Sequence, residues 1–104
     1  SNKSFFIEYF QMPMTKKRTR LELFIDILSE MSSGTCKPTN IMYRCNLSWK
    51  PLQEILDSMV QQDLIRVVQK RKRKTYEITE KGMDTLKYIE KARALVAFRE
   101  VRNA

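Results

Sequence analysis

Histidine is absent from this 104-residue chain, and it has only two cysteines, Cys36 and Cys45. This composition excludes zinc fingers, histidine-ligated metal sites and Cys-His or Ser-His catalysis. The sequence also has no Gly-rich phosphate loop and no nucleophile–base pair, so we expect no enzymatic activity, no metal site and no cofactor. Nothing marks the chain as secreted, and we therefore expect both cysteines to be reduced, small apolar side chains of the core.

Glycine and proline are also scarce, at two and three residues, which favours long regular elements. No apolar run approaches the roughly 20 residues of a membrane span, and no signal peptide is evident. What the chain has in excess is positive charge: 20 Lys and Arg against 12 Asp and Glu give a net charge of +8. Such a charge predicts a nucleic acid as partner, because a membrane surface would require a basic amphipathic helix. We expect a cytoplasmic, nucleoid-associated protein.

Two helices are predicted in the first half of the chain. The first extends from about residue 19 to residue 32, because apolar residues recur there at the spacing of one helical face. Its apolar stripe consists of Leu21, Phe24, Ile25, Leu28 and Met31. A short helix follows over residues 39–44, with Thr39 as its expected N-cap and Ile41 and Met42 as apolar anchors.

A third helix is predicted from Trp49 to about Gln62. Ser48 is placed to accept a hydrogen bond from an unpaired backbone N–H, and Pro51 lies in the first turn, where a missing N–H costs little. The expected buried stripe consists of Leu52, Ile55, Leu56 and Met59. Asp63 comes where the chain must leave the helix, in a left-handed conformation that Asp tolerates.

Five consecutive cations separate two short β-like segments, residues 64–68 and 75–79. A hairpin with this run at its tip is typical of a wing that contacts DNA phosphates, since five like charges repel one another unless they meet a polyanion. The run consists of Lys70, Arg71, Lys72, Arg73 and Lys74. It contains no glycine for a turn, so we expect a flexible tip.

A last helix, capped by Thr79, is predicted to continue to about Arg102. At 24 or so residues it would be about 36 Å long, more than the rest of the domain can cover. Its later apolar residues could pack on the first helix, but its length favours pairing with a second chain. The expected dimerisation residues are Leu86, Ile89, Leu95, Val96 and Phe98.

Helix, short helix, turn, capped helix and hairpin follow one another in the order of a winged helix-turn-helix. The sequence therefore predicts a mainly α fold with a small β-hairpin (α+β), followed by a long C-terminal coiled-coil helix. Residues 41–52, residues 76–82 and residues 18–22 resemble the corresponding blocks of a family of small archaeal winged-helix regulators. The resemblance covers about residues 16–100.

That resemblance implies a dimeric protein that binds double-stranded DNA, with the last helix pairing as an antiparallel coiled coil. The chain departs from the family pattern at Asp63, where the pattern usually has glycine, and in its basic wing without a glycine turn. An aromatic extension over residues 1–11 is not part of the pattern. The predicted organisation is an N-terminal extension at 1–15, a DNA-binding domain at 16–79 and a dimerisation helix at 80–104.

The expected DNA contacts lie in three places. A basic arm precedes the first helix, the third helix presents its N-terminal turn to the major groove, and the wing contacts phosphates. Glu54 and Asp57 argue against deep insertion of the whole third helix, because phosphates repel carboxylates. Besides the five wing cations, the candidates are Lys16, Lys17, Arg18, Arg20, Tyr43, Arg44, Ser48, Trp49, Lys50 and Gln53.

Two other functions fit the same features. An architectural DNA-binding protein of this fold would show little sequence preference, as the acidic third helix allows. A protein-interaction module would dock residues 1–11 and the last helix onto another protein. We expect a regulator that binds duplex DNA as a homodimer, with no membrane and no small-molecule ligand as partner.

Overall fold

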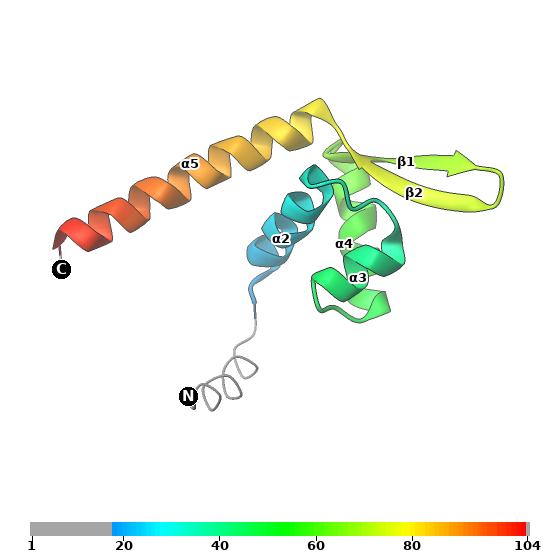
Figure 1. The fold of residues 1–104 in the computed structure, drawn as a ribbon, viewed down its shortest axis with the longest axis horizontal. Helices are drawn as coiled ribbons and strands as arrows, with labels where there is room; N and C mark the ends of the chain where they lie inside the picture. Colours follow the sequence, from blue (N-terminus) through cyan, green and yellow to red (C-terminus); the bar gives the residue numbers. More distant parts are fainter. Residues whose placement is uncertain (1–17, 104) are drawn as a thin grey trace.

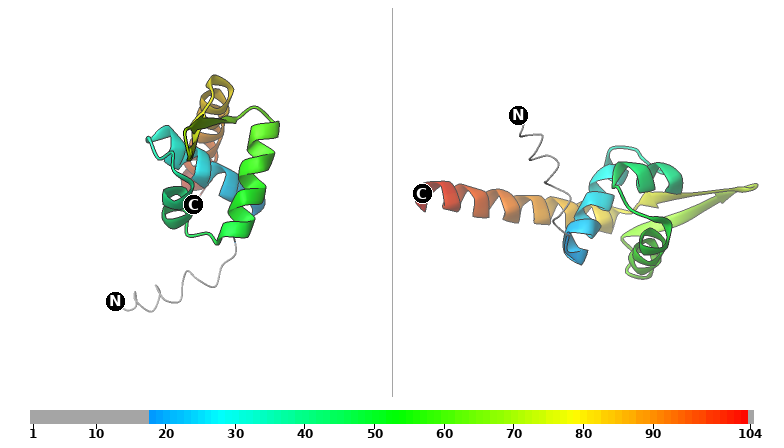
Figure 2. Two further views of the ribbon diagram at one scale, coloured as in Figure 1. Left: turned by 90° about the vertical axis from the view of Figure 1, so that its right-hand side faces the viewer. Right: turned by 90° about the horizontal axis from the view of Figure 1, so that it is seen from below.

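The computed structural model describes residues 18–103, and the side chains of residues 18–97. The elements follow the predicted order: α2 (Arg20–Ser32), α3 (Pro38–Arg44), α4 (Trp49–Gln61), β1 (Ile65–Lys70), β2 (Arg73–Ile78) and α5 (Glu80–Asn103). The first three helices form a central body, from which the hairpin extends to one side and α5 to the other (Figures 1 and 2). The predicted winged-helix architecture with a long last helix is confirmed.

Apolar side chains from every element meet in one core inside the central body. Three residues of the stripe predicted in α2 are buried there and Phe24 packs against them, but Leu21 is 62% exposed and lies outside the core. Ile27, outside the predicted stripe, is fully buried. The core residues are Ile25, Ile27, Leu28, Met31, Ile41, Cys45, Leu52, Ile55, Leu56, Met59, Leu64, Ile65, Tyr76 and Leu86.

Two of the predicted helix caps are wrong in detail. Thr39 lies inside α3, because Pro38 already begins the helix and needs no N–H there. Ser48 occupies the N-cap position of α4 as predicted, but its side chain makes no capping hydrogen bond. Thr79 does cap α5: its Oγ1 accepts a hydrogen bond from Gly82 N at 3.0 Å and donates one to Asp63 O at 2.6 Å.

The three body helices end in the same way, with a left-handed residue just after the last turn. These residues are Gly34 (φ 106°), Asn46 (φ 55°) and Asp63 (φ 62°). In each case the next N–H reaches back to a carbonyl five residues earlier, as in Leu64 N to Met59 O at 2.9 Å, which is the Schellman arrangement. The predicted left-handed conformation of Asp63 is thereby confirmed.

We expect Asp63→Gly to stabilise the protein. Glycine adopts positive φ without steric cost, whereas other L-residues pay for it, so the free energy of unfolding should rise by about 0.5–1 kcal/mol. Chemical denaturation measures the difference. Gln61→Gly, inside the last turn of α4, is the matched control and should destabilise by about 1 kcal/mol. An equal decrease in the free energy of unfolding in both variants would show that the backbone of Asp63 is not strained.

The hairpin strands extend further than predicted, and only Arg71 and Lys72 lie in the turn. The antiparallel register pairs Ile65 with Ile78 at the base and Lys70 with Arg73 at the tip. Arg71 has φ 54°, a left-handed value that a two-residue hairpin turn requires at its first position. The basic run therefore belongs mostly to the ladder and not to a long loop.

The beginning of α5 belongs to the core of the body, and this overturns one predicted dimerisation contact. Leu86 is 4% exposed and packs inside its own chain, so it has no surface left for a partner. Ile89 is half-buried against the same core. Leu95 and Val96 are more than half exposed, as is Tyr88, and the side chain of Phe98 lies outside the described residues.

Both cysteines are free thiols. Cys45 is buried as predicted, and burial raises the pKa of its thiol to about 11. Cys36 is only half-buried, contrary to the prediction, because it lies in the exposed connection between α2 and α3. Within the described residues, no helix is both long enough and apolar enough to span a membrane.

Candidate nucleic-acid interface

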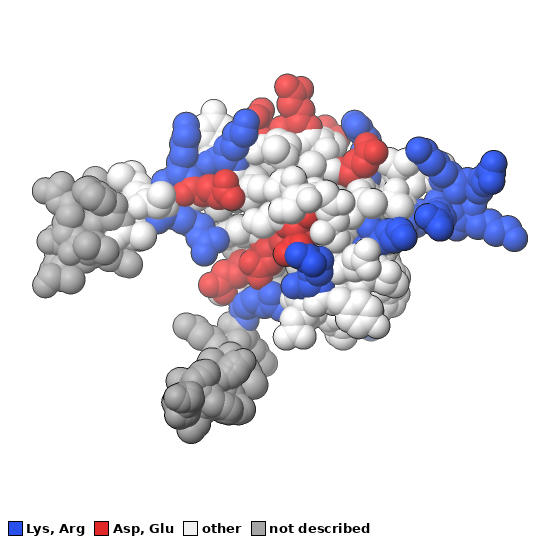
Figure 3. All heavy atoms as spheres, viewed as in Figure 1, with Lys and Arg blue, Asp and Glu red and all other residues white. Residues whose placement is uncertain are grey.

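Positive charge is concentrated in the hairpin. Residues 18–62 carry five Lys and Arg against five Asp and Glu, so the helical part of the body has no net charge. Residues 63–79 carry six Lys and Arg against two Asp and Glu, a net charge of +4 in 17 residues. Figure 3 shows the result: basic atoms gather over the hairpin tip at the right of the view. The wing is therefore the strongest candidate surface for a polyanion.

All five cations of the wing, residues 70–74, are exposed. The hairpin has its own ion pair lower down, where Arg66 and Glu77 approach to 3.2 Å, but among the described residues no carboxylate pairs with residues 70–74. Lys70 and Arg73 lie on one face of the ladder and Lys74 on the other, because successive strand residues alternate. The wing therefore presents cations on both of its faces.

The N-terminal turn of α4 presents the second group of predicted contacts. Ser48, Trp49 and Lys50 are all exposed, with Trp49 at 49%. Gln53, one turn further on, donates from its amide to Asp57 Oδ1 at 3.0 Å, so this donor is already used within the helix. The first turn of α4 therefore places two exposed polar side chains, Ser48 and Lys50, beside an exposed aromatic ring.

The end of α3 contributes Tyr43 and Arg44. Tyr43 is 76% exposed, whereas Arg44 donates from Nε to Glu30 Oε1 at 2.6 Å. This hydrogen bond raises the pKa of Arg44, whose guanidinium remains largely exposed beyond Nε. Of these two residues, Tyr43 is therefore the stronger candidate for a DNA contact, because the Nε of Arg44 already donates to Glu30.

Part of the candidate interface was not predicted from the sequence. A hollow of about 580 Å³ lies between the α2–α3 connection and α3, and exposed Lys37 and Asn40 line it together with Tyr43 and Arg44. Cys36 O accepts a hydrogen bond from Tyr76 N in β2 at 2.9 Å, so Lys37 lies beside the base of the wing. The pairing of this connection with β2 has no signal in the local sequence, since a single bridging residue leaves no alternating pattern.

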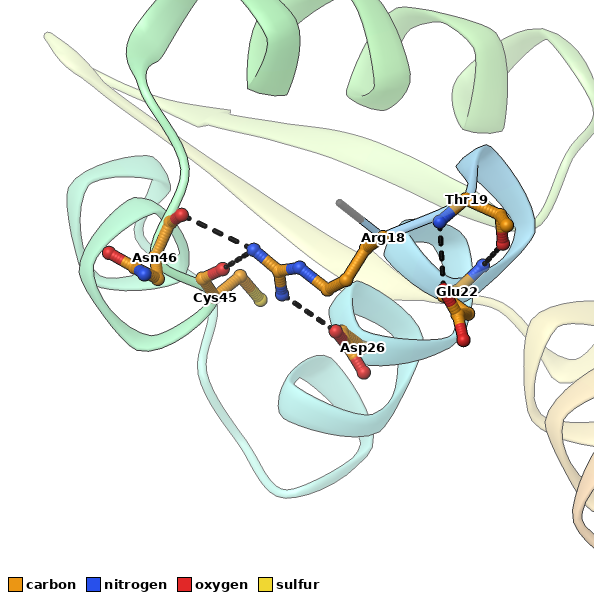
Figure 4. A network of polar contacts seen from close by, with 6 residues as sticks. All are labelled: Arg18, Thr19, Glu22, Asp26, Cys45 and Asn46. Carbon is orange, nitrogen blue, oxygen red and sulfur yellow. Dashed lines mark hydrogen bonds and ion pairs between the residues drawn. The ribbon is translucent and has the colours of Figure 1, made fainter. Parts of the chain in front are cut away.

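The predicted basic arm is only partly described. Lys16 and Lys17 lie outside the described residues. Arg18 lies at the surface with its side chain 33% exposed, and its guanidinium donates to Asp26 Oδ2 at 2.7 Å and to the carbonyls of Cys45 and Asn46 at 2.6 and 3.2 Å (Figure 4). Arg20 is exposed and lies 5.7 Å from the centre of the Phe24 ring. Arg18 therefore already has three oxygen partners, which makes it a weaker candidate for a phosphate contact than predicted, whereas Arg20 has no carboxylate partner among the described residues.

Comparisons with known proteins agree with this architecture. A sequence profile of the winged helix-turn-helix family matches residues 17–97. An uncharacterised protein of Methanocaldococcus jannaschii is 30% identical over 66 residues, and the match spans 64% of this chain and 64% of that relative's length. The crystal structure of Sso10a-2, a DNA-binding protein from Sulfolobus solfataricus, superposes with a TM-score of 0.64 at 26% identity, covering 82% of this chain and 92% of that one.

The transcriptional regulator BldR from the same organism has a similar fold. Its structure superposes with a TM-score of 0.64 at 23% identity, over 71% of this chain and 56% of BldR. At this identity the likeness concerns the fold alone.

Proposed function

The chain belongs to the winged helix-turn-helix family, and on that premise we propose that it binds double-stranded DNA as a transcriptional regulator and is not an enzyme. The observation that carries the proposal is the concentration of five exposed cations at the tip of the wing, none of which has a carboxylate partner among the described residues, beside a body (residues 18–62) with no net charge. Sso10a-2, which is 26% identical and described as DNA-binding, supports it.

In this proposal the wing supplies most of the affinity and α4 supplies the base contacts. Lys50 and Trp49 in the first turn of α4 enter the major groove, where a lysine can donate to guanine and an aromatic ring can contact a thymine methyl group. Glu54 and Asp57 keep the remainder of the helix away from phosphates. The wing then lies on the backbone or in the adjacent minor groove.

The structure refines which residues we propose as DNA contacts. Lys37 and Asn40 join the set, because both line the hollow beside Tyr43 and Lys37 follows Cys36, whose carbonyl is bonded to β2. Arg44 and Gln53 are weaker candidates, since each already has a carboxylate partner. The proposed contacts are Arg20, Lys37, Asn40, Tyr43, Ser48, Trp49, Lys50, Lys70, Arg71, Lys72, Arg73 and Lys74, with Lys16 and Lys17 in the arm that precedes them.

Selection of bound sequences from a random duplex pool tests this function. A regulator should enrich one motif, whose affinity exceeds that of mixed-sequence DNA by a factor of about 10³ or more. Tight binding without an enriched motif would favour the second candidate, an architectural DNA-binding protein, which the acidic later turns of α4 make credible. Failure to bind any duplex at low salt would contradict both and favour a protein-interaction module.

We also propose that residues 80–104 form a dimerisation helix. The exposed part of α5 carries Tyr88, Leu95 and Val96, and apolar side chains of this size are usually covered. A second copy of α5 would cover them in an antiparallel pair. Two symmetric α4 helices would then read a palindromic site with half-sites about one helical turn of DNA, or a multiple of it, apart.

The double substitution Leu95→Glu with Val96→Glu should convert the dimer into a monomer. Two carboxylates buried in an apolar helix pair would each remain without a partner, which costs several kcal/mol. Sedimentation equilibrium measures the mass of each variant. Lys87→Glu, at an exposed polar position of the same helix, is the control and should leave the mass unchanged. A dimer that survives the double substitution would place the interface elsewhere.

A further inference from the structure

Arg18 joins three parts of the molecule that are far apart in the sequence. One arm of its guanidinium donates to Asp26 on α2, and the other donates to the carbonyls of Cys45 and Asn46, 27 and 28 residues away (Figure 4). Just after it, Thr19 and Glu22 form a reciprocal capping box that fixes the start of α2. The backbone that carries Arg18 is therefore itself held in place.

The two carbonyls belong to the turn that connects α3 to α4. The C-terminal carbonyls of a helix lack intrahelical partners and carry its negative dipole end, so a guanidinium there is favourable. Asn46 is left-handed, and Ser48, the N-cap of α4, follows two residues later. Whatever fixes the carbonyls of Cys45 and Asn46 also fixes where the first turn of α4 begins.

We propose that Arg18 is a positioning residue that sets the first turn of α4 for base contact and does not itself touch DNA. This inference rests on the proposed duplex-binding function. The planar guanidinium has two separate N–H arms, one for the Asp26 carboxylate and one for the turn carbonyls. A lysine ammonium keeps the charge but cannot span both sides of this clamp.

The competing role is that of a phosphate-binding arm, as the sequence predicted, and the two roles give opposite results. A phosphate contact requires only the charge, so Arg18→Lys would preserve it, and Asp26→Ala would strengthen it by freeing the guanidinium and removing a negative charge. A clamp requires the fork and its carboxylate, so both substitutions would weaken binding. The dependence of duplex affinity on salt separates the two roles as well. Loss of one phosphate contact makes the slope of log affinity against log salt concentration shallower by about 0.9.

The experiment measures duplex affinity by fluorescence anisotropy between about 0.05 and 0.2 M salt, the range over which phosphate contacts dominate. The duplex is the tightest sequence obtained from the random pool. The proteins are wild type, Arg18→Lys, Arg18→Ala and Asp26→Ala, with Lys72→Ala as the comparison for one lost phosphate contact. We expect each of the three clamp variants to bind about tenfold more weakly, because a hydrogen bond to a charged group is worth at least that factor. Their salt slopes should equal that of wild type, while the slope of Lys72→Ala becomes shallower.

Hydrogen exchange distinguishes a local change at the α3–α4 turn from a general loss of stability, which would affect amide protons throughout the protein. The amide protons of Asn46 and Leu47, bonded to Tyr43 O and Met42 O, should exchange faster in the clamp variants while those of α5 do not. Full affinity in Arg18→Lys, tighter binding by Asp26→Ala, or a slope reduced to that of Lys72→Ala would each overturn the clamp. A wild-type protein that binds no duplex would instead overturn the proposed function, so the two failures are distinguishable.

Discussion

Replacing Lys70, Lys72 and Lys74 by glutamine should lower the affinity for duplex DNA by about a hundredfold at 0.1 M salt, since each phosphate contact releases close to one counterion. These side chains lie at the wing tip, exposed and without carboxylate partners among the described residues. Glutamine keeps a long, polar side chain, only one atom shorter than lysine, and leaves the backbone ladder of the hairpin intact. The loss therefore reports the charge and not the fold, and anisotropy of a labelled duplex measures it.

The matched control removes three charges from the opposite side of the molecule. Lys87, Lys91 and Arg93 are exposed on α5, which extends away from the wing (Figure 1). Glutamine at these positions changes the net charge by the same amount, and affinity should fall only a few-fold through the general field. Equal losses in the two variants would mean that net charge, and not the wing, governs binding. Sedimentation of the control confirms that its oligomeric state is unchanged.

Gly82→Ala should destabilise the protein by about 3 kcal/mol or more, the upper part of the range for overpacked sites. A Cβ atom at this position would lie 2.1 Å from Leu64 O and 2.8 Å from Ile78 Cγ1. The first contact is with backbone, and Leu64 O already accepts a hydrogen bond from Thr79 N at 3.0 Å. Neither group can move without opening the junction between α4, the hairpin and α5.

Thermal and chemical denaturation measure this effect. Asp84→Ala, an exposed position in the same part of α5, is the control and should change the free energy of unfolding by no more than about 0.5 kcal/mol. Alanine is intrinsically a better helix former than glycine, so a protein stabilised by Gly82→Ala would show that α5 does not approach Leu64 as closely as described. Such a result would also mean that α5 does not pack against the core from which the wing extends.

The sequence predicted the order and type of the elements because each carries a strong local signal. The helical stripes, the Thr79 cap and the two strands around the basic run can all be read within a few residues. The left-handed Asp63 was predicted for the same reason, since a polar residue tolerant of positive φ stands where the chain leaves α4.

What the sequence could not show are contacts between distant segments. Arg18 reads as part of a basic arm, and only the fold brings Asp26 and the α3–α4 turn to it. Leu86 was predicted to be a dimerisation residue, and only the packing of α5 on the body buries it in its own chain. Lys37 carried no signal at all, because its position beside the wing depends on one backbone hydrogen bond to β2.

The most direct test of the wing as the main source of affinity is the dependence of duplex affinity on salt. About six phosphate contacts should give wild type a slope near −5 in a plot of log affinity against log salt concentration, at about −0.9 for each contact. In the variant with glutamine at residues 70, 72 and 74, we expect the slope to be shallower by about 2.7. An unchanged slope in that variant would contradict the account.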